Sequence, residues 1–178
     1  MEWLVIDEKY LDYLRIIDSR IPYSDYGENR YKPFFGVLFE TEHFCYVTQI
    51  AHAQSRHQNM KANLDFKKLF HPKDNSLIAV VNLNYMFPIP KNMKKKLEYK
   101  DIGLHRQFET EEEKSKYIDL MKIELNILNN MNLEKSAKIV YDNKYTKKNK
   151  TLAARCIDFK KMEEMAIRYD SNDLVHKE

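Results

Sequence analysis

The chain has 178 residues, a length typical of one domain, and a net charge of +3. Hydrophobic residues make up 43% of it, which suffices for a sizeable core, while three glycines and five prolines are too few for a fibrous or disordered chain. No apolar run approaches the roughly 18 residues that cross a membrane, and the N-terminus is acidic where a signal peptide is basic. Two cysteines cannot form a disulfide framework, so we expect a cytoplasmic protein with reduced thiols and no membrane contact.

Four segments carry helix signals. Asp7 is a suitable N-cap for a first helix near the N-terminus. Thr110 and Glu113 form a capping box in front of a long amphipathic stretch. A shorter helix is predicted after Asn132, and Asp158 caps a last one.

Strand signals cluster in the first half of the chain. Apolar and aromatic runs predict strands over residues 34–39, 44–50, 77–83 and 85–87. The first two are close enough for a hairpin, and the third lacks polar alternation, which is typical of a central strand. Pro88 and Pro90 are expected to stop the fourth strand.

Loops and boundaries complete the prediction. Pro22 ends the first helix, residues 19–33 form an ordered tyrosine-rich loop, and the basic segment 142–155 forms a loop or hairpin. One domain spans residues 1–170, and a frayed tail spans 171–178. Early strands followed by helices indicate an α+β fold with a mostly antiparallel sheet.

Lysines are concentrated in two places although the net charge is small. The first cluster contains Lys91, Lys94, Lys95, Lys96 and Lys100, and the second contains Lys144, Lys147, Lys148 and Lys150. Segregated positive charge can hold a polyanion. The alternative is that each run is a solvated loop.

Most standard catalytic motifs are missing from the sequence, but residues 50–61 are rich in reactive side chains. The chain has no glycine-rich phosphate loop, no G-x-S-x-G and no C-x-x-C, and the His52–His57 pair has no cysteine partners for zinc, so we expect no metal or other cofactor. The segment itself contains His52, Gln54, Ser55, Arg56, His57 and Lys61 directly after a predicted strand. RNA can be cut when its 2′-OH attacks the adjacent phosphate, which needs a base, an acid and a cation. Histidine and basic side chains supply these functions, although a polar loop with packed histidines is the alternative.

The order of short motifs along the chain resembles the ToxN/AbiQ family, the endoribonuclease toxins of type III toxin–antitoxin systems. The motifs lie at residues 10–14 (YLDYL), 18–22 (DSRIP), 32–37 (KPFFGV), 81–89 (VNLNYMFPI) and 156–163 (CIDFKKME). The resemblance runs from about Tyr10 to Tyr169, nearly the whole chain.

This resemblance implies a strongly twisted antiparallel sheet, akin to Kid/MazF-type toxins, flanked by helices. It also implies metal-independent RNA cleavage that leaves a 2′,3′-cyclic phosphate. The inhibitor would be a structured pseudoknot RNA antitoxin, bound in a cyclic toxin–RNA hetero-oligomer. The target would be mRNA, and the biological role abortive defence against phage.

The resemblance also assigns site residues. Lys32 matches the family's active-site lysine, and Tyr10 matches a tyrosine near the active groove, although packing explains Tyr10 equally well. Tyr26 or Tyr31 matches a loop tyrosine. At position 51 the family carries Ser or Thr, whereas this chain has Ala51, which cannot transfer a proton.

Two explanations fit Ala51. Either His52, Ser55 or His57 takes over the missing function, with Arg56 as the phosphate-binding cation, or Ala51 is an inactivating Ser→Ala change. We favour the second explanation because the rest of the motif is intact. A non-catalytic RNA-binding module and an adaptor for a protein partner are the alternative functions.

RNA contacts are expected from cations and from aromatic rings. The cations are Lys61, Lys91, Lys94, Lys95, Lys96, Lys144, Lys147, Lys148 and Lys150, and the rings are Tyr26, Tyr31 and Tyr145. The lysines would track phosphates and the rings would stack on unpaired bases.

Overall fold

A computed structural model describes residues 1–27 and 30–175, with side chains described as far as residue 169. Its strands are β1 (Glu2–Val5), β2 (Phe34–Gly36), β3 (Phe44–His52), β4 (Phe66–Phe70), β5 (Leu77–Asn82), β6 (Phe87–Pro90) and β7 (Lys95–Lys96). The strand order is β4-β5-β3-β2-β1-β7, with β6 paired to β3 off this path, and the pairings are antiparallel. The predicted α+β fold with an antiparallel sheet is therefore confirmed.

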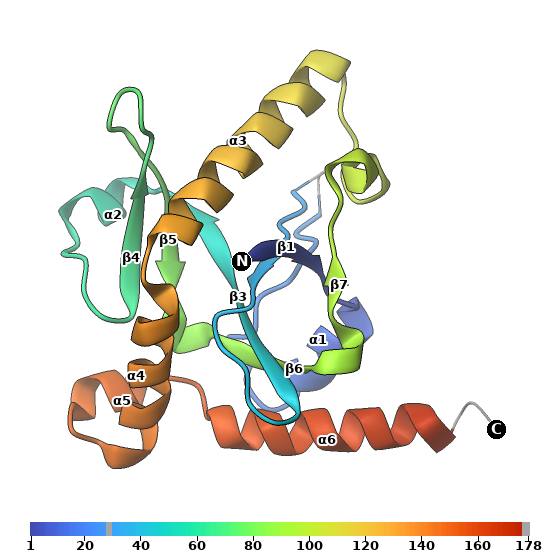
Figure 1. Cartoon of the computed structure of the whole chain (residues 1–178), viewed down its shortest axis with the longest axis vertical. Coiled ribbons are helices and arrows are strands. Elements are labelled where there is room, and N and C mark those ends of the chain that lie inside the picture. Colours follow the sequence, from blue (N-terminus) through green and yellow to red (C-terminus); the bar gives the residue numbers. More distant parts are fainter. Residues whose placement is uncertain (28–29, 176–178) are drawn as a thin grey trace.

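Helices flank the sheet. They are α1 (Glu8–Arg15), α2 (Ser55–Asn59), α3 (Glu111–Asn130), α4 (Leu133–Thr146), α5 (Lys150–Arg155) and α6 (Phe159–Val175), with 3₁₀ turns η1 (Leu83–Tyr85), η2 (Lys91–Met93) and η3 (Tyr99–Leu104). Figure 1 shows α3 crossing the fold diagonally and α6 running along its lower side. No helix among the described residues is long and apolar enough to span a membrane.

Strand β3 is the longest strand and forms the centre of the fold. Its first residues pair with β6, its middle pairs with β2, and its last three residues pair with β5. The strand continues past Ile50, where the sequence pattern ends it, to His52. Ala51 and His52 therefore lie on a rigid sheet ladder and not in a loop.

Three predicted caps are present. The Asp7 carboxylate accepts a hydrogen bond from the Lys9 backbone N–H, and Thr110 Oγ1 accepts one from that of Glu113. The Asp158 carboxylate accepts one from the backbone N–H of Lys161.

The predicted ending of the fourth strand is wrong. Strand β6 contains both Pro88 and Pro90, and residues 83–85 form η1. Both prolines can occupy the strand because β3 is its sole partner among the described residues, and residues two apart direct their backbone groups to the same side. The Pro88 carbonyl points away from β3, since it accepts a hydrogen bond of 2.7 Å from the Tyr10 hydroxyl.

Other boundaries also differ from the sequence pattern. Helix α1 ends at Arg15, well before Pro22, and the basic segment 142–155 is helical in most of its length. The last helix continues to Val175, beyond the start of the expected frayed tail, and residues 176–178 lie outside the described residues. The short elements β1, β4, β7 and α2 were not predicted, because two to five residues carry too little periodicity.

Gly36 permits the close packing of β2 on β3. A Cβ atom at this position would lie 2.9 Å from Val47 Cγ1, so only glycine permits the close approach of the two strands. The hairpin continues past β2, since the backbone N–H of Leu38 donates to the Tyr46 carbonyl at 2.9 Å.

Candidate active site

The end of β3 meets the loop that precedes β2. Phe34 of β2 pairs with Gln49 of β3. Lys32 lies two residues before Phe34, outside the paired part of β2, and it lines the same small cavity as Ile50 and His52 of β3. The structure therefore brings Lys32 next to the two residues that flank position 51.

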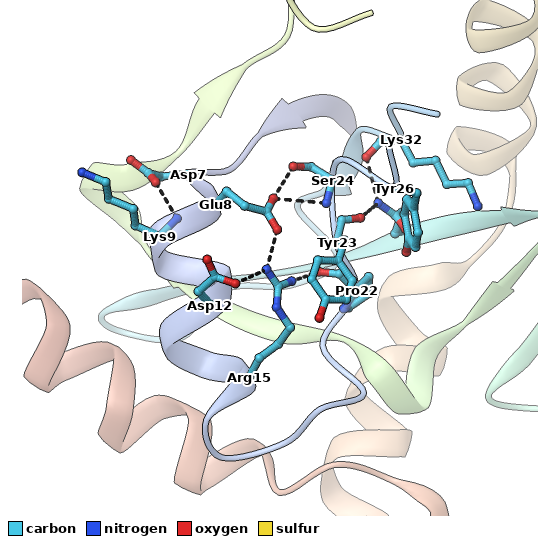
Figure 2. A network of polar contacts seen from close by, with 11 residues as sticks. Asp7, Glu8, Lys9, Asp12, Arg15, Pro22, Tyr23, Ser24, Tyr26 and Lys32 are labelled. Carbon is cyan, nitrogen blue, oxygen red and sulfur yellow. Dashed lines mark hydrogen bonds and ion pairs between the residues drawn. The ribbon is translucent and has the colours of Figure 1, made fainter. Parts of the chain in front are cut away.

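Lys32 is half-buried at this place. Its Nζ lies 4.6 Å from the centre of the Tyr26 ring, and Figure 2 shows the two side chains next to each other. Partial burial, followed by the positive charge of Arg30, lowers the pKa of the Lys32 ammonium. A cation that has already lost part of its hydration interacts more strongly with a phosphate than one in bulk water.

A polar network holds the loop that carries Tyr26 and Lys32 against α1. Arg15 pairs with both Glu8 and Asp12 and donates to the Pro22 carbonyl at 2.8 Å. The Ser24 hydroxyl donates to the Glu8 carboxylate, as Figure 2 shows. Because α1 is packed on the core through buried Leu11 and Leu14, the loop is fixed to a rigid element.

His52 lies on the other face of β3 from Ala51, because successive side chains of a strand alternate. The residue reaches the protein surface, while part of it is enclosed between β3 and α3. Desolvation by the surrounding protein, followed by the positive charges of Lys32 and Arg106, lowers its pKa. The neutral form thus predominates at pH 7, which is the form that accepts a proton.

Arg106 is a cation near the site that the sequence analysis did not identify. It lies between η3 and α3, and its Nη2 donates to Glu113 at 3.1 Å. Its guanidinium lies 4.5 Å from the centre of the Tyr117 ring. The sequence does not point to Arg106, because it is far from residues 50–61 in the chain and belongs to no lysine cluster.

A small cavity lies between the end of β3 and α3. It has room for about 20 Å³, enough for about one water molecule. Its lining residues are Trp3, Lys32, Pro33, Ile50, His52, Tyr117, Leu120, Met121 and Glu124. Glu124 is only 4% exposed, and its Oε1 has no hydrogen-bond partner among the described residues. Burial raises the pKa of this carboxyl to about 8, so it is largely protonated at neutral pH.

The structure does not bring Tyr10, Tyr31 or His57 to this site as reactive groups. Tyr10 is fully buried, with its hydroxyl donating to the Pro88 carbonyl beside the first half of β3. Tyr31 is also buried, and its ring stacks on His105 at 4.9 Å, so neither face is open to a base.

His57 is 5% exposed and faces β4, where its ring lies 5.9 Å from that of Phe66. Burial, with the charges of Arg56 and Lys68, lowers its pKa. Its Nδ1 accepts from the Gln54 backbone N–H at 3.1 Å, which indicates a role in starting α2 rather than in proton transfer.

The other polar residues of this segment lie on or after α2. Ser55 and Arg56 are exposed in α2, directly after the end of β3, and Lys61 is exposed just beyond the helix. All three are accessible to a large ligand. Tyr26 is 36% exposed, and its hydroxyl donates to Gln49 Oε1 at 3.0 Å.

The two lysine clusters lie in different parts of the molecule. Figure 1 shows β7 on one side of the fold and α4 with α5 on another. Several lysines near β7 pair with carboxylates: Lys91 with Glu40, Lys94 with Glu2 and Lys96 with Glu98. Lys95 and Lys100 are exposed there.

The cluster at α4 and α5 is divided between a structural and a surface role. Lys144 donates to the carbonyls of Ala153 and Cys156 at 3.2 and 2.9 Å, so it caps the end of α5. The exposed cations are Lys147, Lys148 and Lys150. Tyr145 lines two surface pockets, one shared with Lys148 and the other with Lys147 and Lys150. Its hydroxyl donates a hydrogen bond to Asp158 at 3.1 Å.

Within the described part of the chain, no group of three or more His, Cys, Asp or Glu residues is placed to hold a metal ion. The contacts described above group the end of β3, Lys32 with Tyr26, and Arg106 as the candidate active site.

Comparisons with known proteins give the same assignment over nearly the whole chain. The family model "Toxin ToxN, type III toxin-antitoxin system" matches residues 2–167. The chain is 29% identical to the endoribonuclease ToxN of Bacillus thuringiensis subsp. kurstaki over 175 residues, 94% of this chain and 84% of the relative. It is 28% identical to the endoribonuclease ToxN of Pectobacterium atrosepticum over 92 residues, 50% of this chain and 54% of that protein.

Solved structures are similar as well. One, described as a type III toxin inhibited by a non-coding RNA pseudoknot, matches with a TM-score of 0.75 and 26% identity over 95% of this chain and 97% of the other. The lactococcal anti-phage endoribonuclease AbiQ has the same fold, with a TM-score of 0.76 at 18% identity over 96% and 98% of the two chains. The chain therefore belongs to the ToxN family of type III toxin–antitoxin systems, a family of endoribonuclease toxins.

Proposed function

We propose that the active form of this protein is a metal-independent endoribonuclease that cleaves single-stranded RNA, and that Ala51 replaces its catalytic hydroxyl. The observation that carries the proposal is that Lys32 lies close to His52, which directly follows position 51 on β3. Both residues line one cavity, and the charge of Lys32 adds to desolvation in lowering the pKa of His52.

In this reaction the 2′-oxygen of RNA forms a bond to phosphorus while the bond from phosphorus to the 5′-oxygen breaks. The 2′-hydroxyl loses a proton to a base, and the leaving 5′-oxygen gains one from an acid. The products are a 2′,3′-cyclic phosphate and a 5′-hydroxyl.

The proposed roles follow from the positions of the side chains. A Ser or Thr hydroxyl at position 51 would orient the reacting oxygens, and Lys32 would stabilise the charge on the phosphorane. Neutral His52 accepts a proton, and Arg106 holds a neighbouring phosphate. Desolvation, followed by the charges of neighbouring cations, lowers the pKa values of Lys32 and His52, which supports their placement in one partly enclosed, positively charged site.

The proposed natural inhibitor is a structured RNA, as in the similar solved structure that is inhibited by a pseudoknot. The exposed cations Lys147, Lys148 and Lys150 at the α4–α5 turn offer a surface for its phosphates. Losing each phosphate contact would lower the slope of log affinity against log salt by roughly 0.7 to 0.9. We propose a closed toxin–RNA assembly and a role in phage defence, consistent with the anti-phage relative.

The test restores the hydroxyl. The original chain and its Ala51→Ser and Ala51→Thr forms are incubated with single-stranded RNA in EDTA, and the product ends are analysed. Ala51→Val is the matched control, because valine has the shape of threonine without its hydroxyl. Cleavage by the Ser or Thr form alone, at least about 100-fold above the control and with cyclic phosphate ends, is expected.

Ala51 itself favours a second function, a non-catalytic RNA-binding module. RNA binding by all four forms without cleavage by any would support that function. It would also overturn the proposed nuclease.

A further inference from the structure

Gln49 connects the strand of the candidate site to the loop that carries Lys32. It is 9% exposed, and it precedes Ala51 by two residues, on the same face of β3. Its Nε2 donates to the Lys32 carbonyl at 2.8 Å and to the Tyr23 carbonyl at 2.9 Å. Its Oε1 accepts from the Tyr26 hydroxyl at 3.0 Å. One buried amide thus makes three contacts to the loop.

Lys32 is held on both sides of its Cα atom. Its backbone N–H donates to the Ser24 carbonyl at 2.7 Å, and its carbonyl accepts from Gln49. Ser24 is in turn held by Glu8 of α1. The backbone of Lys32 is therefore tied to α1 through Ser24 and to β3 through Gln49, and this fixes where its side chain begins.

Tyr26 is held by the same amide. Its ring lies against the Lys32 ammonium, and its hydroxyl is fixed by Gln49. Gln49 thus restrains both the backbone of Lys32 and the ring beside its Nζ. Both N–H donors of the amide and one of its two acceptor lone pairs are used in hydrogen bonds to this loop.

We infer that Gln49 is a positioning residue, which sets Lys32, partly by holding the Tyr26 ring against its Nζ, where RNA binding and cleavage require it. The inference rests on the proposed function of Lys32 as the cation that contacts RNA phosphate. A displacement of about 1 Å at such a group is enough to reduce catalysis strongly. Gln49 acts through Lys32 and does not itself touch the substrate.

A double-mutant cycle tests this inference in the chain as it stands, where Ala51 permits binding to be measured on intact RNA. Affinities for short fluorescent single-stranded RNA are measured for Lys32→Met, Gln49→Leu and the pair. Lys32→Met is expected to weaken binding about tenfold, and Gln49→Leu at least about threefold. In the Lys32→Met background, Gln49→Leu is expected to have little further effect, because its action passes through Lys32.

Two further variants separate positioning from general stability. Gln49→Glu keeps an acceptor for Tyr26 but loses both donors to the carbonyls, so it should weaken binding as much as Gln49→Leu. Thr48→Val is the matched control. It removes a buried polar group of the same strand, whose contact is to the Asn82 carbonyl at 3.4 Å and not to the loop. Thermal unfolding establishes the folded fraction of every variant, and Gln49→Glu replaces Gln49→Leu in the cycle if the latter does not fold.

The outcomes are distinct. Unchanged binding in Lys32→Met would remove the proposed role of Lys32, and the inference with it. Two outcomes would overturn only the inference, provided that Lys32→Met weakens RNA binding. In one, the Gln49 variants lose as much affinity in the Lys32→Met background as in the original chain. In the other, the Gln49 variants lose no affinity at all. Non-additive loss, with Thr48→Val unchanged, supports it.

Discussion

The two halves of β3 use the same backbone ladder for opposite purposes. In the first half, Tyr46 is fully buried, its ring stacks on Phe39 at 4.4 Å, and its hydroxyl donates to Glu163 at 2.8 Å. In the second half, Ile50 and His52 line a cavity together with Lys32, whose ammonium lies against the Tyr26 ring. One half builds the core and the other presents side chains to a ligand.

Two glutamates show the difference. Glu163, beside the first half, accepts hydrogen bonds from both Tyr46 and Tyr141. Glu124, beside the second half, has a buried oxygen without a partner among the described residues. A buried polar group without a partner lowers stability, so such groups are retained mostly where a site needs them. The comparison teaches that the carboxylate beside the core half of β3 is fully paired, whereas the one beside the second half is not.

The largest effect is expected from the core half. Phe87→Ala in β6 removes a fully buried ring that packs edge-on against Phe34 at 5.5 Å. The free energy of unfolding should fall by about 3–5 kcal/mol, measured by urea unfolding. RNA affinity of the molecules that remain folded should not change. A loss of less than about 1 kcal/mol would contradict the assignment of this half to the core.

The next effect concerns catalysis at the other half. In the Ala51→Ser form, Lys32→Met should reduce the rate of RNA cleavage about 100-fold or more, because a positioned cation no longer stabilises the phosphorane. Initial rates under excess enzyme provide the measurement. Lys138→Met is the matched control, since Lys138 lies on α4 and pairs with Glu134. Equal rates for the two variants would exclude Lys32 from the chemistry.

Glu124 predicts a pH dependence of stability. Its folded-state pKa of about 8 lies above its ordinary value of 4.5, so the folded state binds this proton more tightly than the unfolded state. The resulting stabilisation is complete below pH 4.5 and is lost as the pH rises to 8, by up to about 1.4 kcal/mol per pH unit.

Chemical denaturation across this range should show that Glu124→Gln removes the decline. Glu164→Gln, an exposed change on α6, should leave it unchanged. An identical decline in Glu124→Gln and in the original chain would show that another group is responsible.

The smallest effect is a shift in the titration of His52. Because the charges of Lys32 and Arg106 lower its pKa, Arg106→Gln should raise it. NMR titration of the imidazole in the original chain and the variant measures the change. Lys122→Gln on α3, where the lysine pairs with Asp119, serves as the control. An unchanged His52 pKa in Arg106→Gln would place Arg106 outside the site.

The sequence predicted the long elements and the residues at the end of β3. Strand β3, the central strand β5 and helices α3, α4 and α6 follow from sustained apolar patterns and from caps at Thr110 and Asp158. The short strands β1 and β7 carry no such pattern, and the prolines of β6 argue against a strand unless its edge position is known. The basic segment around α5 was not recognised as helical because its charges dominate the pattern.

Lys32 and position 51 were identified from sequence, whereas Gln49, Arg106 and Glu124 were not. Each of these three acts through contacts between segments that are distant in the chain: Gln49 with the loop before β2, Arg106 with Tyr117, and Glu124 with the cavity under β3. Tyr10 was predicted as a site residue from the family resemblance, with packing as the alternative, and His57 from its reactive side chain; the fold buries both.

The amino-acid sequence by itself determined the fold class, the family and the strand end where the chemistry is expected, because these depend on local periodicity and on motifs contiguous in the chain. The tertiary structure decided which polar groups face one another, which are desolvated and which are packed away. Burial and electrostatic coupling depend on distances in space, and residues far apart in sequence set those distances.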